Sequence, residues 1–478
     1  MYIGLDLGTS GLKGILIDEE QRVLAEAVAP LYVSRPHEGW SEQSPADWIA
    51  AAEAVMDQLA AQGLSEVKAI GLSGQMHGAT LLDASDEVLR PCILWNDTRS
   101  HAEAVALDAD PRFRAITGNI VFPGFTAPKL VWVERHEPAI RERVAKVLLP
   151  KDYLRLWLTG EHVAEMSDAA GTSWLDVGAR DWSDALLAAT GLTREAMPRL
   201  VEGSAVSGAL RPALAARWGL PQGVVVAGGG GDNAASAVGV GVVRAGEAFV
   251  SLGTSGVLFA ANDGYQPAPE TAVHTFCHAL PGAWHQMGVI LAATDALNWY
   301  ARLVGQEASA LTKELGELQA PGRTLFLPYL GGERTPLNDA AIRGAFTGLE
   351  HATDRAAGTR AVLEGVTFAI RDCRDALAAT GTRLESLIAV GGGSRSLYWL
   401  SAIATALDVP VLLPAAGDFG GAFGAARLAF MAATGAGAEI ATLPPIARTL
   451  SPDRGLTAAF DDAHARHRAA QTAIRSLS

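Results

Sequence analysis

The pentapeptide Leu-Gly-Thr-Ser-Gly occurs twice in this chain, at residues 7–11 and again at 252–256. Each copy lies between two apolar segments typical of β-strands, so each is predicted to be a tight turn that joins two strands. The copies are separated by about half of the chain, and self-similarity at that distance predicts two lobes built on one plan. We place the first lobe at residues 1–243 and the second at 244–478.

Length and composition agree with this plan. A chain of 478 residues is too long for one hydrophobic core. Its formal net charge of −14 opposes binding to nucleic acid or to an anionic membrane surface. We see no secretory signal and no run of ~20 apolar residues that could span a membrane. The three scattered cysteines fit a reducing compartment, so we expect a cytoplasmic protein without nucleic-acid or membrane partners.

Both turns have the chemistry of a phosphate-binding loop. The first offers the N–H group of Gly8 and the hydroxyls of Thr9 and Ser10, and the second offers Gly253 and Thr254. Successive N–H groups and hydroxyls in such a turn can hold a phosphate.

Asp6 stands in the apolar strand before the first turn, where a carboxylate is costly unless it is satisfied. A Mg²⁺ ion or its water shell would satisfy it, because Mg²⁺ prefers carboxylate oxygen. A plain hairpin in which Asp6 pairs with a nearby N–H group or with Lys13 agrees with the sequence equally well.

Each half then continues with a helix, a short strand and a loop suited to a ligand. In the first half a helix opened by Ser44-Pro45 and a strand over 67–72 lead into Gln75, Met76 and His77. Ligands of α/β sheets bind at strand ends, which makes this loop a candidate binding site. A surface histidine beside a core methionine is the competing interpretation.

In the second half a helix over 360–378 and a strand over 387–390 lead into Gly391, Gly392, Gly393 and Ser394. Bare backbone there would let an adenine or ribose lie against the chain. A tight strand-to-helix turn is nearly as compatible.

The segment Ala-Gly-Gly-Gly-Gly-Asp-Asn over 227–233 leads from an apolar strand into an Ala-rich helix. Four glycines allow a ligand to approach the main chain, and Asp232 would project from the first turn of the helix. An exposed aspartate has a pKa of about 3.9 and is ionised at pH 7. Taken alone, a helix N-cap explains Asp232 better.

The sequence leaves the role of three further loops undecided. Residues 94–99 combine aromatic, amide, acid and base, which suits a hydroxyl-rich ligand or a solvated loop. Glu333 and Arg334 are slightly better explained as a structural ion pair. The glycines Gly421 and Gly424 enter an Ala-rich helix, which indicates either nucleotide binding or close helix packing.

Together these segments resemble the FGGY family of carbohydrate kinases. The resemblance is carried by residues 6–10, 74–78, 230–233, the first family signature at 124–136, and the second at 344–349 and 360–365. It covers residues 1 to about 433. The last ~45 residues carry no motif, and their Ala/Arg-rich pattern suggests a surface helix.

The resemblance implies an α/β fold of two actin-like, ribonuclease-H-like ATPase lobes with a catalytic cleft between them. The first lobe would bind mainly sugar and the second mainly ATP. Met76-His77 is similar to the loop of those members that phosphorylate D-xylulose to D-xylulose 5-phosphate in pentose catabolism. A homodimer is also implied.

By the same resemblance Asp232 would be the general base. The sugar would be bound by Gln75, Met76, His77, Asp232 and Asn233, and Mg²⁺ by Asp6 and Asp232. The cofactor ATP would be bound by Asp6, Gly8, Thr9, Ser10, Gly253, Thr254, Gly392, Gly393, Gly421 and Gly424.

Three alternatives remain: a kinase for another ketose or polyol such as ribulose or glycerol, an actin-like nucleotide-binding protein without sugar transfer, and a non-catalytic sugar-binding regulator. A filament needs no sugar loop, and a regulator would be expected to lack Asp6 or Asp232, so we favour a kinase.

Overall fold

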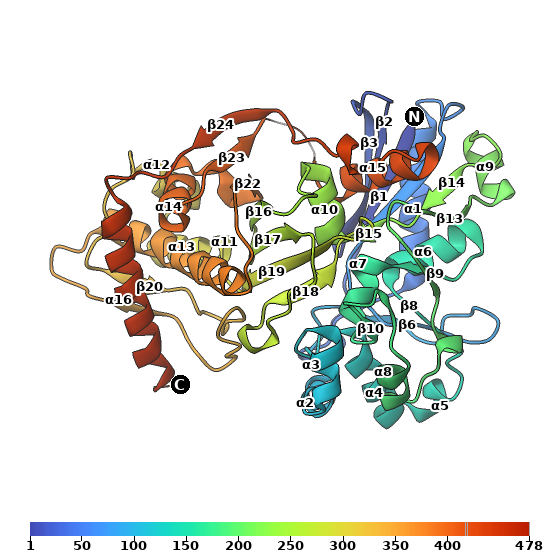
Figure 1. Cartoon of the computed structure of the whole chain (residues 1–478), viewed down its shortest axis with the longest axis horizontal. Coiled ribbons are helices and arrows are strands. Elements are labelled where there is room, and N and C mark those ends of the chain that lie inside the picture. Colours follow the sequence, from blue (N-terminus) through green and yellow to red (C-terminus); the bar gives the residue numbers. More distant parts are fainter. Residues whose placement is uncertain (416, 418, 478) are drawn as a thin grey trace.

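The computed structural model describes residues 1–415, 417 and 419–477, and the chain forms two lobes side by side (Figure 1). The sheet of the first lobe contains, in spatial order, β13 (Val206–Ala209), β14 (Val225–Ala227), β5 (Ala69–Gly74), β1 (Tyr2–Leu7), β2 (Gly11–Ile17) and β3 (Val23–Pro30). The short strand β15 (Gly230–Gly231) also pairs with β5.

The sheet of the second lobe repeats this order and adds one strand at its far edge. It contains β24 (Ile446–Leu450), β23 (Val411–Pro414), β22 (Ser386–Val390), β16 (Glu247–Leu252), β17 (Gly256–Asn262), β19 (Trp284–Ile290) and β18 (His274–Cys277). In both lobes the two strands around the repeated turn are antiparallel, and the next central strand is parallel to the first of them. The predicted two-lobed α/β fold is confirmed.

Side chains along β1 point alternately to the two faces of the first sheet, and each face is covered by a different helix. Ile3 and Leu5 share a buried cluster with Trp48 of α1 (Pro45–Ala60), whereas Tyr2 faces the other way and shares a cluster with Phe423 of α15 (Gly421–Thr434). A strand turns successive side chains to opposite faces, so one apolar strand supplies two cores.

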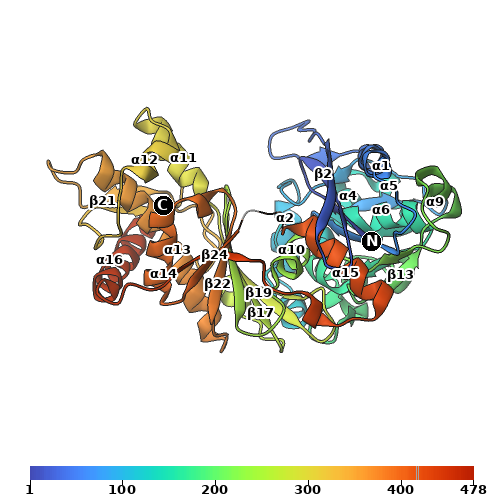
Figure 2. The same cartoon turned by 90° about the horizontal axis from the view of Figure 1, so that it is seen from above.

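Helix α15 comes from the C-terminal half of the sequence but packs on the first lobe. Figure 2 shows it beside α10 (Asp232–Val240), among the N-terminal elements. A Cβ on Gly4 or Gly71 would lie 1.9 or 1.8 Å from a carbonyl oxygen of this helix. The division at residue 243 follows the order of the chain and does not say on which lobe α15 packs, because a contact between backbones of distant segments leaves no pattern in either segment.

The other elements complete the lobes. The first lobe also contains β4 (Glu42–Gln43), β6 (Thr80–Leu82), β7 (Cys92–Ile93), α2 (His101–Asp108), α3 (Pro111–Thr117), α4 (Thr126–His136), α5 (Pro138–Arg141), β8 (Lys146–Leu148), α6 (Pro150–Thr159), β9 (Val163–Glu165), α7 (Met166–Ala169), β10 (Leu175–Asp176), β11 (Asp181–Trp182), α8 (Asp184–Ala189), β12 (Arg199–Val201) and α9 (Pro212–Trp218). The second lobe also contains α11 (Thr294–Leu303), α12 (Ala308–Lys313), β20 (Leu325–Leu327), β21 (Ala345–Thr347), α13 (Arg355–Ala379), α14 (Leu397–Leu407) and α16 (Thr457–Arg475).

The C-terminal tail does more than form a surface helix. Its strand β24 pairs with β23 at the edge of the second sheet, and α16 buries Phe460, Ala463 and His467 against the lobe. None of the helices that the structure describes is long and apolar enough to cross a membrane.

Candidate active site

A cavity of about 460 Å³ lies between the lobes. The first lobe contributes residues that include Met76, His77, Trp95, Phe122, Asp232 and Asn233. The second lobe contributes Ser255, Val257, His274, Phe276, Met287 and Arg334. The first lobe supplies most of the lining residues, and the second lobe completes the wall with a smaller set that an expectation drawn from the first lobe alone misses.

Asp232 stands where the glycine loop becomes α10. Its Oδ1 atom accepts hydrogen bonds from the backbone N–H of Asn233 at 2.7 Å and from the side-chain amide of Asn233 at 2.9 Å. Burial in the protein, and then the charge of nearby Asp6, raise the pKa of Asp232 to about 6. The ordinary pKa expected for an exposed aspartate is therefore wrong, because the two lobes enclose the loop.

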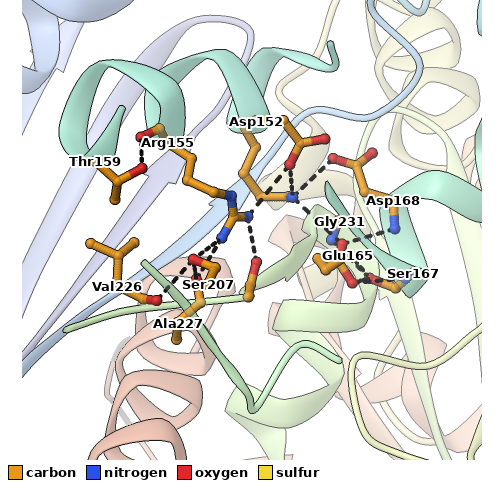
Figure 3. A network of polar contacts seen from close by, with 12 residues as sticks. Asp152, Arg155, Thr159, Glu165, Ser167, Asp168, Ser207, Val226, Ala227 and Gly231 are labelled. Atoms are coloured by element: carbon orange, nitrogen blue, oxygen red, sulfur yellow. Dashed lines mark hydrogen bonds and ion pairs between the residues drawn. The ribbon is translucent and has the colours of Figure 1, made fainter. Parts of the chain in front are cut away.

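The glycine loop is held by buried polar side chains of α6 and α7 (Figure 3). Arg155 donates to the carbonyl oxygen of Ala227 at 2.7 Å and to that of Gly228 at 2.5 Å. On the other side of the loop, the backbone N–H of Gly231 donates to Ser167 Oγ at 3.0 Å. Main-chain groups on both sides of the bend before Asp232 therefore have fixed partners.

A cluster of buried charges supports these contacts (Figure 3). Lys151 Nζ lies 2.8 Å from Asp152, 3.6 Å from Glu165 and 3.4 Å from Asp168, and all four side chains are fully buried. Burial raises the pKa of Asp168 well above its ordinary value, with Asp152, Glu165 and Asp232 adding repulsion. Removing one member of this cluster would leave a buried charge without a partner, which is costly. The cluster therefore holds α6 and α7 in place beneath their contacts with the loop.

His77 lines the cavity in a defined protonation state. Its Nδ1 atom lies 2.8 Å from the carbonyl oxygen of Gly171, and burial lowers its pKa to about 3. The ring is therefore neutral at pH 7. A carbonyl oxygen can only accept, so Nδ1 carries the proton and Nε2 is left as an acceptor. Stacking on Phe125, with ring centroids 4.6 Å apart, holds the ring in place.

Lys129 fixes the backbone on which His77 stands. Its Nζ donates to the carbonyl oxygen of His77 at 2.8 Å and to that of Gly124 at 2.7 Å. Burial lowers the pKa of Lys129 to about 7. The first signature segment and the His77 loop are thereby tied together.

Gln75 lies outside the cavity, although the sequence predicts it as a sugar ligand. It is buried, accepts from Thr9 Oγ1 at 2.9 Å and donates to Gln43 at 2.8 Å. Thr9 in turn accepts from the indole N–H of Trp95 at 3.0 Å. Gln75 therefore connects the first turn to the cavity wall, and its geometry indicates a positioning role.

Asp6 lies behind Asp232 at the end of β1. Ser73 donates to its Oδ1 atom at 2.8 Å, and a Cβ on Gly421 would come within 2.9 Å of Oδ2. Gly421 therefore leaves room for this carboxylate at the start of α15. Asp6 raises the pKa of Asp232, so two acids share one region. A divalent cation fits there, because it would offset their repulsion with the oxygen ligands it prefers.

A second cavity, of about 420 Å³, opens beside the sheet of the second lobe, at β16, β22 and β23. Its lining includes Ser236, Phe249, Gly391, Ser394, Leu413 and Gly420. Gly392, on the same loop as Gly391, is exposed, while Gly393 packs on Leu252 and Trp399. The predicted adenosine loop thus lies at this cavity.

The other residues expected to bind ATP lie in helix packing or in the two repeated turns. Gly424 lies in the contact between α15 and α10, where a Cβ would be 1.7 Å from the carbonyl oxygen of Ala235, so its role here is helix packing. The carbonyl of Gly253 in the second turn accepts from both the N–H and the hydroxyl of Thr294. These bonds brace the turn and leave Thr254 exposed. Gly8 and Ser10 lie in the matching first turn, where the N–H of Gly8 donates to Gly11.

Several residues of the cavity wall were not predicted from the sequence. They are the aromatic residues Phe122 and Phe125 and the buried His274, whose pKa burial lowers well below its usual range. Phe125 lies within the first signature, which could have drawn attention to it. His274 stands in an ordinary apolar strand, and no local pattern marks it.

Comparison with known proteins agrees with this geometry. Residues 1–239 match the N-terminal domain of the FGGY family of carbohydrate kinases, and residues 248–433 match its C-terminal domain. The chain therefore belongs to the FGGY family of carbohydrate kinases.

Individual relatives narrow the comparison. The chain is 51% identical over 468 residues to a protein named xylulose kinase from Escherichia coli, covering 96% of each chain. It is 64% identical, with a TM-score of 0.99 over the full length of both chains, to a crystal structure described as a xyloylose kinase from Brucella ovis. A xylulose kinase structure from Rhodospirillum rubrum is 32% identical, with a TM-score of 0.94 over 100% of this chain and 99% of that one.

Proposed function

We propose that this protein transfers the γ-phosphoryl group of ATP to D-xylulose and forms D-xylulose 5-phosphate. The observation that carries the proposal is a carboxylate with a raised pKa, Asp232, held on a braced loop in the wall of an interlobe cavity. Membership of a carbohydrate kinase family supports the reaction class, and relatives named xylulose kinase support the sugar.

Asp232 accepts the proton of the terminal hydroxyl as its oxygen attacks the γ-phosphorus. A base works best when its pKa lies just below the working pH, and the pKa of about 6 meets that condition at pH 7. His77 Nε2 accepts a hydrogen bond from a sugar hydroxyl, and the amide of Asn233 donates to another. Phosphoryl transfer otherwise requires positioning and charge stabilisation.

The nucleotide lies between the repeated turns and the second cavity. The turn residues Gly8, Thr9, Ser10, Gly253 and Thr254 surround the phosphates and offer them N–H and hydroxyl groups. The N–H of Gly8 and the hydroxyl of Thr9 are not among these donors, because they already donate to Gly11 and to Gln75. The loop containing Gly392 and Gly393 receives the adenosine. When bound, Mg²⁺ neutralises phosphate charge, and Asp6 and Asp232 would hold it, in part through water.

The test is ADP release with ATP and Mg²⁺ across D-xylulose, L-ribulose, D-ribulose, glycerol and no sugar. The wild type is compared with Asp232→Asn and with the control Asp263→Asn, an exposed aspartate. We expect a large D-xylulose-dependent rate that Asp232→Asn removes and Asp263→Asn leaves unchanged. A faster rate with another sugar would keep the chemistry and overturn the substrate.

The actin-like alternative is not favoured, because the chain matches carbohydrate kinase domains over both lobes. Sugar-independent ADP release accompanied by ATP-dependent light scattering would restore it. We also propose a homodimer, on the family resemblance alone. Sedimentation velocity tests it, and a single species of 49.8 kDa would contradict it.

A further inference from the structure

Arg334 lies on a loop of the second lobe, between β20 and β21, and the charges of Arg334 and its acidic neighbour Glu333 attract each other without forming a close ion pair. The carboxylate of Glu333 instead accepts the backbone N–H groups of Arg334 at 2.8 Å and of Leu291 at 2.9 Å. Among the described residues, no ion pair joins Glu333 to the Arg334 guanidinium. The structural ion pair suggested by the sequence is therefore wrong, and the guanidinium is left to face the cavity.

The side chain of Arg334 reaches across to the first lobe. Its guanidinium carbon lies 4.7 Å from the ring centroid of Phe122, which also lines the cavity. His274 of β18 lies against the same ring, with centroids 5.3 Å apart. Phe122, His274 and Arg334 thus form one end of the cavity, which we call the aromatic end.

The carboxylate of Asp232 belongs to a different part of the wall. It is hydrogen-bonded to Asn233, and the preceding Gly231 packs on Met76. Although Arg334 and Asp232 line the same cavity and carry opposite charges, they form no ion pair. The cavity that both residues line has a volume of about 460 Å³, which is enough for a small sugar to contact both of them.

The charges along the wall make Arg334 chemically distinct. Asp97 is engaged by Arg99, with Nη2 to Oδ2 at 2.7 Å, and the rings of His77 and His274 are neutral at pH 7. Among the described residues that line this cavity, Arg334 is the cation. Guanidinium offers five N–H donors and no acceptor.

We propose that Arg334 is a specificity-determining residue that donates hydrogen bonds to the carbonyl oxygen at C2 of an open-chain ketose. The assignment rests on the proposed function: with the C5 hydroxyl at Asp232, the carbonyl end of a five-carbon chain extends to the aromatic end. A carbonyl oxygen only accepts, so it matches the Arg334 guanidinium, which only donates. A pentitol has a hydroxyl at C2, whose proton finds no acceptor on guanidinium.

The experiment compares D-xylulose with xylitol and D-arabinitol, its two C2-reduced forms, by steady-state ADP release. Variants are Arg334→Met, Arg334→Lys and the control Arg302→Met, an exposed arginine on α11. A hydrogen bond to a charged donor contributes about 1.5–3 kcal/mol, or roughly 10- to 150-fold in binding. We expect Arg334→Met to raise KM for D-xylulose by at least about tenfold with a smaller change in kcat, and Arg334→Lys to lie between.

The ratio of kcat/KM for D-xylulose over each pentitol is the deciding readout, because a purely structural role would not move it. We expect Arg334→Met to lower this ratio about tenfold while Arg302→Met leaves it unchanged. An equal loss for ketose and pentitol, or no loss, overturns the proposal. If Arg334→Met does not fold, the same ratio measured for Arg334→Lys decides. A wild type with no activity on D-xylulose would instead refute the proposed function itself.

Discussion

At the scale of single residues, the environment of a side chain matters more than its type. Asp232 titrates near pH 6 because it is enclosed and close to Asp6. His77 is neutral because it is buried, and its one free nitrogen is an acceptor because a carbonyl occupies the other. These states decide which groups can take or give a proton at pH 7.

As the proposed general base, Asp232 sets the expected pH dependence of the reaction. The base must be ionised, so kcat/KM for the sugar is expected to fall at low pH, with its midpoint at or below about 6 because a Mg²⁺ ion held by Asp232 would lower the pKa of its carboxyl. Fixed-time ADP assays from pH 4.5 to 8 measure the profile. A kcat/KM that rises toward low pH would contradict Asp232 as the base.

The raised pKa of Asp232 also means that its ionised form lowers the stability of the fold at neutral pH. Its pKa is about 6 in the fold against a usual 3.8, so the folded protein binds more protons than the unfolded chain between these values. Stability from this group is present at low pH and is lost as pH rises through about 6. Asp232→Asn is therefore expected to stabilise the fold at pH 7.5 by at most roughly 3 kcal/mol, and by little at pH 4. Urea unfolding at both pH values measures the difference, and a destabilised variant at pH 7.5 would contradict it.

At the scale of elements, the site depends on how neighbouring segments hold one loop. Arg155 on α6 and Ser167 on α7 bind main-chain groups on either side of the bend before Asp232. On the far side of Asp232, α10 packs closely on α15. The loop is positioned by its supports, since four glycines alone would leave it free to move.

Removal of one support should lower kcat more than it raises KM. Ser167→Ala leaves the buried N–H of Gly231 without its partner, a loss of about 1–3 kcal/mol. We expect kcat to drop about tenfold, with KM for the sugar changed less. The exposed Ser309→Ala is the control. If kcat stays within about twofold of the wild type, Ser167 does not position the loop.

Contact between α10 and α15 predicts a sharp difference between two glycines. Gly424→Ala would place a methyl group 1.7 Å from the carbonyl oxygen of Ala235, so the helices must move apart. Overpacking of this kind costs about 1–3 kcal/mol, and thermal unfolding should show a lower Tm. Gly264→Ala, with no atom within 4 Å of the new Cβ, should leave Tm unchanged. Equal Tm values for both variants would refute the contact.

At the scale of the whole molecule, the two halves of the sequence are joined by a packed helix as well as by the cavity between the lobes. Helix α15 belongs to the second half of the sequence but covers one face of the first sheet, over Tyr2, Gly4 and Gly71. The two halves are therefore interdependent for folding.

A fragment of residues 1–243 tests this interdependence. It lacks α15, so an apolar sheet face is exposed, and we expect no cooperative unfolding transition by circular dichroism and rapid proteolysis. Co-expression with residues 244–478 should restore both. A fragment that unfolds cooperatively at the Tm of the whole chain would show that the first lobe is independent of α15.

Local signals explain why much of the fold was predictable. The repeated Leu-Gly-Thr-Ser-Gly turn lies between apolar strands in both lobes, and each loop that was predicted to bind a ligand follows a central strand. Period and turn chemistry are properties of short segments and can be read directly. The position of a residue in the fold cannot be read from a short segment. For this reason the sequence did not show that Gln75 lies in a hydrogen-bonded positioning network or that Gly424 lies in a contact between two helices.

The sequence by itself determined the duplicated α/β plan, the family and the loop that carries Asp232, because each depends on residues that are neighbours along the chain. Only the tertiary structure decided the pKa of Asp232, the second-lobe wall with His274 and Arg334, and the return of α15 to the first lobe. Each of these depends on burial and on contacts between distant segments. Such contacts exist only once the chain has folded.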